Sequence, residues 1–190
     1  MGDKLIIFDC FGVLTSEVAP IWLRRYFDDY TADKIHQSII VDGDKGILSA
    51  DQMFKELSLI VDEPADDILN DWIDIGALHE DLIEYIKSLK ERGFKTAFLS
   101  DSSYGFVKLL IDKYNLEPLF DTIVVSSEVG FLKANPEMFN LVLDRLIIKP
   151  ENAIMVDDRQ SNLDSAEKVG IKGILYKDTQ SFKEALESII

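Results

Sequence analysis

Short apolar runs alternate with helical patterns along the chain, most densely in its second half. The runs are four or five residues long and rich in branched side chains, which is typical of buried strands rather than of helices. They lie at residues 4–8, 95–99, 122–126, 153–156 and 173–176. Between them, apolar positions such as Leu82, Ile86 and Leu89 repeat at helical spacing. The alternation predicts an α/β fold, with a parallel sheet between two layers of helices.

The segment between the first two predicted strands has a different pattern. Residues 16–79 carry helix signals but no strand signal, including Ser49 and Gln52 at the spacing of a capping box. We therefore expect a core formed by residues 1–15 and 80–190, and a small α-helical cap domain formed by residues 16–79. An insert that leaves the C-terminal end of a parallel strand lies over the edge where such sheets bind ligands, so the cap can act as a lid.

Four polar clusters each follow one of the first four predicted strands. They are Asp9, the Ser100–Asp101 pair, Lys133, and the Asp157–Asp158 pair. Taken alone, each has an ordinary explanation as a turn residue, a helix cap or a solvated lysine. Together they are expected to lie close to one another, because the C-terminal ends of parallel strands share one edge of the sheet. A carboxylate, a hydroxyl, an ammonium and a carboxylate pair at that edge indicate a site for transferring an anionic group.

Composition narrows the classes of function. The chain has 190 residues, of which 47% are hydrophobic, and a formal net charge of −15. That charge argues against nucleic acid or an anionic membrane as a partner, because both select basic surfaces. No apolar run has the length of a membrane span, and we expect no signal peptide. The single cysteine, Cys10, excludes an intramolecular disulfide and favours a small buried side chain in a cytoplasmic protein. Monomer and homodimer both stay open.

The order and chemistry of the four clusters resemble the four motifs of the haloacid dehalogenase superfamily, over essentially the whole chain. The matching segments are residues 8–14, 99–101, 130–139 and 156–166. One departure is Ala134, which stands where the family often has proline. Residues 46–54 are similar to the cap of the branch that holds α-D-glucose-1-phosphate phosphatase and the N-terminal phosphatase of soluble epoxide hydrolase. The resemblance implies a three-layer, Rossmann-like core with a small helical cap.

The resemblance also implies a Mg²⁺-dependent phosphatase that hydrolyses small phosphate monoesters. Asp9 would be the nucleophile and would form an aspartyl phosphate, with Lys133 as its cationic partner. The ligands of Mg²⁺ would be Asp9, the backbone carbonyl of Phe11 and Asp158, with Asp157 as a further candidate. The groups expected to hold the phosphate oxygens are the Ser100 hydroxyl, the Asp101 backbone N–H and the Lys133 ammonium.

Phe11 breaks the phosphatase pattern. Phosphatases of the superfamily usually carry a second aspartate at this position, which acts as general acid and base, and phenylalanine can do neither. Either the substrates have leaving groups that need no proton, or another residue supplies it, with Asp101 as the first candidate. An aromatic residue here also resembles the haloacid dehalogenases themselves, which attack carbon and use no metal. The Asp157–Asp158 pair favours the phosphatase, and a non-catalytic binding or regulatory protein on this scaffold is the third reading.

Two further groups of residues lie outside the four polar clusters. Residues 20–30 are predicted to form one amphipathic cap helix that carries Trp22, Arg24 and Arg25. Either an arginine meets a substrate anion, or Trp22 is buried and both arginines are solvated or paired with Asp28 or Asp29. We favour the second interpretation. His36 and His79 are not spaced as metal ligands, and no role is assigned to them.

Overall fold

The core is a five-stranded parallel sheet in a computed structural model that describes residues 4–190. Its strands are β1 (Leu5–Phe8), β2 (Lys95–Ser100), β3 (Thr122–Val125), β4 (Ala153–Asp157) and β5 (Lys172–Leu175). The order across the sheet is β3-β2-β1-β4-β5, and every neighbouring pair is parallel. The predicted α/β fold with a Rossmann-like parallel sheet is confirmed, and each predicted strand lies within one residue of an observed one.

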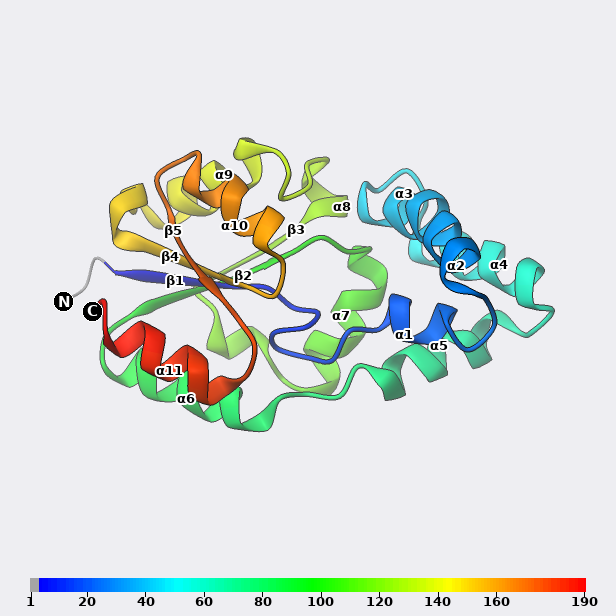
Figure 1. Cartoon of the computed structure of the whole chain (residues 1–190), viewed down its shortest axis with the longest axis horizontal. Helices are drawn as coiled ribbons and strands as arrows, with labels where there is room; N and C mark the ends of the chain where they lie inside the picture. Colours follow the sequence, from blue (N-terminus) through cyan, green and yellow to red (C-terminus); the bar gives the residue numbers. More distant parts are fainter. Residues whose placement is uncertain (1–3) are drawn as a thin grey trace.

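Helices cover both faces of the sheet (Figure 1). One face packs against α6 (Glu80–Glu91), α7 (Tyr104–Lys113) and α11 (Thr179–Glu187), and the other against α9 (Pro136–Leu146) and α10 (Gln160–Glu167). Successive side chains of a strand point to opposite faces, so Ile6 and Phe8 enter the first apolar cluster, whereas Leu5 and Ile7 enter the second. Burial on both faces explains why β1 is apolar throughout.

The register of the sheet brings the polar clusters together. Phe8, the last residue of β1, pairs with Phe98 of β2 and with Val156 of β4. The backbone N–H of Asp9 donates to the carbonyl of Val156 at 3.0 Å, so Asp9 leaves the sheet beside the end of β4. The residues after these three strands therefore emerge at one edge, as the sequence predicts.

The helices between β1 and α6 lie at one end of the molecule (Figure 1). They are α1 (Ala19–Leu23), α2 (Asp29–Ile35), the π-helical turn η1 (His36–Ile40), α3 (Val41–Asp44), α4 (Ala50–Val61) and α5 (Ala65–Ile75). Trp22, Phe54 and Trp72 from these helices share an apolar cluster with Phe106 and Leu110 of α7. We call this segment the cap. Its limits at residues 16 and 79 stay a prediction.

Local signals decide where the cap helices begin. The capping box at α4 is present: Ser49 accepts from the Gln52 N–H at 3.2 Å, and Gln52 accepts from the Ser49 N–H at 2.9 Å. A single amphipathic helix over residues 20–30 was expected, and that prediction is wrong. The Asp28 side chain accepts from the Thr31 N–H at 2.8 Å and starts α2, so the chain between α1 and α2 leaves the helix.

Two contacts attach the cap to the core next to the sheet edge. The hydroxyl of Ser126, which begins α8 (Ser126–Val129), donates to the Asp44 carbonyl at 2.5 Å and accepts from the Ser102 N–H at 2.9 Å. Gly46 has a φ of +73°, and a Cβ on it would lie 2.5 Å from the carbonyl oxygen of Ser127. Only glycine combines this conformation with so close an approach, so α3 and its following turn have a fixed position against the core.

None of the helices in residues 4–190 combines the length and the apolar character needed to cross a bilayer.

Replacing Gly46 by alanine is expected to destabilise the protein more than the same change at Gly93. Both glycines have positive φ, which costs alanine roughly 1–2 kcal/mol. A Cβ on Gly93 meets nothing within 4 Å, whereas one on Gly46 must displace the Ser127 backbone. Urea denaturation of Gly46→Ala and Gly93→Ala measures the difference. Equal losses in the free energy of unfolding would show that the Gly46 contact does not hold the cap.

Candidate active site

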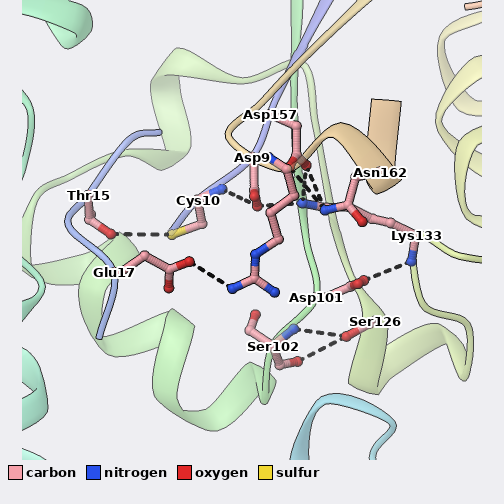
Figure 2. A network of polar contacts seen from close by, with 11 residues as sticks. Asp9, Cys10, Thr15, Glu17, Asp101, Ser102, Ser126, Lys133, Asp157 and Asn162 are labelled. Carbon is pink, nitrogen blue, oxygen red and sulfur yellow. Dashed lines mark hydrogen bonds and ion pairs between the residues drawn. The ribbon is translucent and has the colours of Figure 1, made fainter. Parts of the chain in front are cut away.

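A buried ion cluster lies at the C-terminal edge of the sheet (Figure 2). The Lys133 ammonium is 2.5 Å from Oδ1 of Asp9 and 2.8 Å from Oδ2 of Asp157. Asp9 follows β1, Asp157 ends β4, and Lys133 lies in the loop between α8 and α9. The exposed fractions of Asp9, Lys133 and Asp157 are 6%, 1% and 0%. Three sequence-distant charges thus meet out of contact with bulk water.

Burial and mutual charge set the protonation of this cluster. Burial acts to lower the pKa of Lys133, but the carboxylates of Asp9 and Asp157 outweigh it and hold that pKa above its usual value. Burial raises the pKa of Asp9; Lys133 opposes this effect, and Asp157 and Asp158 add to it. Lys133 is therefore an ammonium, and further positive charge near Asp9 favours its ionised, nucleophilic form.

Asp157 is held by hydrogen bonds on both oxygens. Oδ1 accepts from the Arg159 N–H at 2.9 Å, Nδ2 of Asn162 lies 3.0 and 3.1 Å from the two oxygens, and Oδ2 also binds Lys133. Its carboxylate orients Lys133 and fixes the start of α10.

Asp158 has the opposite character: its Oδ1 is buried and has no hydrogen-bond partner among the described residues. An unpartnered buried carboxylate oxygen is costly unless something else binds it. Asp9, Asp157 and Asp158 can each place one carboxylate oxygen within 4.8 Å of the others. In the part of the chain described, the Phe11 carbonyl accepts no backbone hydrogen bond in the turn after β1. These oxygen donors fit a hard divalent cation.

The expected phosphate-binding residues follow β2. The Ser100 hydroxyl is fully buried and has no hydrogen-bond partner among residues 4–190. Oδ1 of Asp101 accepts from the Lys133 backbone N–H at 2.9 Å, which ties the loop after β2 to the loop that carries Lys133 (Figure 2). The structure thus ties Asp101 to the loop of the ion cluster and places Ser100 at the end of β2, and the roles of both residues stay predictions.

A cavity of about 180 Å³ lies between the edge of the sheet and the cap. Of the predicted site residues, Asp9, Phe11, Asp101 and Lys133 line it, whereas Ser100 and the Asp157–Asp158 pair do not. One wall is polar. The other is apolar and includes Phe11, Met53, Trp72 and Phe106, with the Phe11 and Phe106 rings parallel within 6° and 5.9 Å between their centroids.

Sequence reasoning missed several residues that line this cavity. Arg159 pairs with Glu17 at 2.7 Å, and His36 and Asp44 come from the cap. Of these residues, only Arg159 could have been found from the sequence, because it directly follows the Asp157–Asp158 pair. No local sequence pattern indicates that Glu17, His36 or Asp44 lines a site. Burial, aided by Arg159, lowers the pKa of His36, so its imidazole is biased toward the neutral form.

The remaining expectations have mixed outcomes. Cys10 is buried as predicted, and burial raises the pKa of its thiol. Trp22 is buried, and neither Arg24 nor Arg25 lines the cavity. Arg24 pairs with Asp29 as expected, whereas Arg25 pairs with Asp71 instead of Asp28 or Asp29.

Removing the positive charge at Lys133 is expected to destabilise the fold strongly. Lys133→Met leaves the carboxylates of Asp9 and Asp157 buried without their cation, which costs ~3–5 kcal/mol. Lys90→Met is the matched control, because it breaks a partly exposed pair with Asp121 and is expected to cost at most ~1 kcal/mol. The measurement is the free energy of unfolding of each variant and of the wild type at neutral pH. A Lys133→Met loss no larger than the control would mean that the cluster is not ionised.

Comparisons with known proteins agree with this arrangement. The family model for haloacid dehalogenase-like hydrolases matches residues 4–170. Among curated proteins, bifunctional epoxide hydrolase 2 of Rattus norvegicus is 29% identical over 120 residues, covering 60% of this chain and 21% of that protein. Pyrophosphatase PpaX of Bacillus cereus is 28% identical over 110 residues, covering 58% of this chain and 51% of that one. The chain thus matches about a fifth of the length of the first relative and about half of the length of the second.

Among solved structures, a HAD family enzyme from Bacteroides thetaiotaomicron has a TM-score of 0.82 at 17% identity, covering 98% of this chain and 99% of that one. At that identity the likeness concerns the fold alone. The family model, which covers most of the chain, shows more: the chain belongs to the haloacid dehalogenase-like hydrolase family.

Proposed function

We propose that this hydrolase is a Mg²⁺-dependent phosphatase of small phosphate monoesters, acting through an aspartyl phosphate on Asp9. The observation that carries the proposal is the position of Asp9. Its carboxylate lines the cavity, pairs with the Lys133 ammonium at 2.5 Å, and can approach an unpartnered oxygen of Asp158. A nucleophile with a cation on one side and a metal-binding oxygen on the other suits attack on an anionic ester.

Asp9, the Phe11 carbonyl and Asp158 are the proposed Mg²⁺ ligands. Asp158 is preferred to Asp157, because the oxygens of Asp157 already bind Lys133, Asn162 and the Arg159 N–H. When bound, the ion supplies positive charge that offsets the repulsion between a carboxylate and a phosphate.

The remaining chemistry falls to the protein. The Asp9 carboxylate attacks phosphorus, the ester bond breaks, and the alcohol oxygen leaves with the bonding electrons. Water then hydrolyses the acyl phosphate and regenerates Asp9. The Lys133 ammonium, the Ser100 hydroxyl and the Asp101 backbone N–H hold the phosphate oxygens through both steps.

Relatives support the phosphatase reading. PpaX is named a pyrophosphatase, and the Bacteroides enzyme has been crystallised with magnesium and inorganic phosphate. The small cavity and the net charge of −15 suit a small molecule rather than a nucleic acid. The alternative in which Asp9 attacks carbon in a 2-haloacid draws its support from Phe11, and the tests below separate the two. Cytoplasmic location and oligomeric state stay predictions.

Asp9→Asn is expected to lower phosphate release by several powers of ten, because an amide is a poor nucleophile, while the protein stays folded. Phosphate release from an aryl phosphate with Mg²⁺ and the melting temperature are measured together. Asp74→Asn, an exposed change on α5, serves as the control and should keep full activity. Retention of more than about a tenth of wild-type activity in Asp9→Asn would rule out covalent catalysis by Asp9.

Mg²⁺ is expected to raise the melting temperature of the wild-type protein, because a ligand that binds only the folded state stabilises it by mass action. Asp158→Ala should remove this response. Glu17→Gln should keep it, because Glu17 lines the cavity but is not one of the three clustered carboxylates. Absence of a Mg²⁺ response in the wild type, together with metal-free halide release from a 2-haloacid, would favour the dehalogenase alternative.

A further inference from the structure

Phe11 leaves the proposed phosphatase without the acid that usually protonates the leaving group. Apart from Asp9, three carboxyl side chains line the cavity: Glu17, Asp44 and Asp101. The three carboxyl groups differ in their hydrogen-bond partners and in the side of the cavity from which they would reach a substrate.

Two of the three already bind other groups. Glu17 accepts from the Arg159 guanidinium at 2.7 Å, so its carboxylate already has a charged partner. Oδ1 of Asp101 accepts from the Lys133 N–H at 2.9 Å. Asp101 also belongs to the loop proposed to hold the phosphate oxygens, on the same side as the nucleophile. Neither is well placed to give a proton to a departing alcohol.

Asp44 has no such partner. Its side chain makes no hydrogen bond or ion pair with any residue in the range 4–190, although it faces the cavity. Its position is set through the backbone instead, because the Ser126 hydroxyl binds the Asp44 carbonyl at 2.5 Å. Close packing of Gly43 against Met53, where a Cβ would lie 2.7 Å from the sulfur, restricts α3 further. The carboxyl group is thus held in place and left free.

The surroundings also favour a protonated Asp44. Burial raises the pKa of its carboxyl group well above the usual value, and the neighbouring Asp101 adds to this effect. Arg159 and Lys133 act in the opposite direction, and Glu17 reinforces the rise. A carboxyl group whose pKa is raised by burial is better able to carry the proton that a general acid must supply.

Direction gives a further argument. In-line displacement puts the leaving oxygen on the far side of phosphorus from the attacking oxygen. Asp9 attacks from the edge of the sheet, so the leaving group points toward the cap, from which Asp44 of α3 lines the cavity.

We propose that Asp44 is the general acid and base of this enzyme, supplied by the cap in place of the residue that Phe11 replaces. The inference rests on the proposed phosphatase function. As Asp9 forms its bond to phosphorus and the ester bond breaks, Asp44 gives its proton to the leaving oxygen, and a neutral alcohol departs. Asp44, now a carboxylate, takes a proton from the water that attacks the acyl phosphate. Release of phosphate then returns both carboxyl groups to their starting states.

Asp44→Asn tests the inference, because asparagine keeps the size and the backbone contact but cannot release a proton. We compare kcat/KM, which reports the step that breaks the ester bond, for alkyl and aryl phosphates. For alkyl phosphates, kcat/KM should fall ~10²–10⁴-fold in the variant. For aryl phosphates, whose leaving groups need no proton, kcat/KM should change little. Asp42→Asn is the matched control, because Asp42 lies on the same helix but does not line the cavity. It should leave both substrate classes unchanged.

A second variant tests the same point by rescue. Adding Phe11→Asp to Asp44→Asn should restore part of the alkyl-phosphate activity, because it returns an acid to the usual position. Equal losses for alkyl and aryl phosphates, or no loss for either, would overturn the role of Asp44. Wild-type hydrolysis of aryl phosphates that depends on Asp9 tests the proposed function separately, because that reaction does not need Asp44.

Discussion

The ion cluster of Lys133, Asp9 and Asp157 is the constraint on which the rest of the structure depends. Charges buried this deeply are tolerated only when they are paired and hydrogen-bonded. Pairing them requires that β1 and β4 be neighbours and that the loop before α9 reach across their ends, as the observed strand order allows. The cluster has two carboxylates for one ammonium group, and Asp158 adds a third carboxylate nearby. The arrangement that stabilises the edge of the sheet therefore leaves an excess of negative charge beside Asp9, which one more cation would offset.

The cap complements this edge. The cap contributes most of the apolar wall of the cavity. In our proposal, the core supplies the nucleophile, the ammonium and the metal-binding oxygens, and the cap supplies the proton donor Asp44. Phe11 links the two parts, because its ring stacks on Phe106, which in turn packs against Trp72 of the cap. An aromatic residue at this position thus removes an acid and extends the contact between cap and core. Burial of Asp9, Lys133 and Asp157 at this edge strengthens the charge interactions among them.

Much of the core could be predicted from the sequence, because parallel strands force their C-terminal residues to one edge whatever the details of packing. That rule places Asp9, Lys133 and Asp157 correctly. The cap was less predictable. The break at Asp28 depends on a side chain that competes with the helix backbone, and the pairing of Arg159 with Glu17 depends on how the whole cap docks. Docking is decided by contacts between distant segments, which no local pattern records. The domain limits and the catalytic roles accordingly stay predictions.

The central claim is that phosphate passes through a covalent bond to Asp9. Acid quenching during turnover of an aryl phosphate with Mg²⁺, followed by mass spectrometry of the peptides, tests it most directly. The account predicts one phosphoryl group on the peptide that contains Asp9, localised to that residue and absent when Mg²⁺ is withheld. Steady release of phosphate with no phosphoryl group on Asp9, or with one on a different residue, would contradict the account.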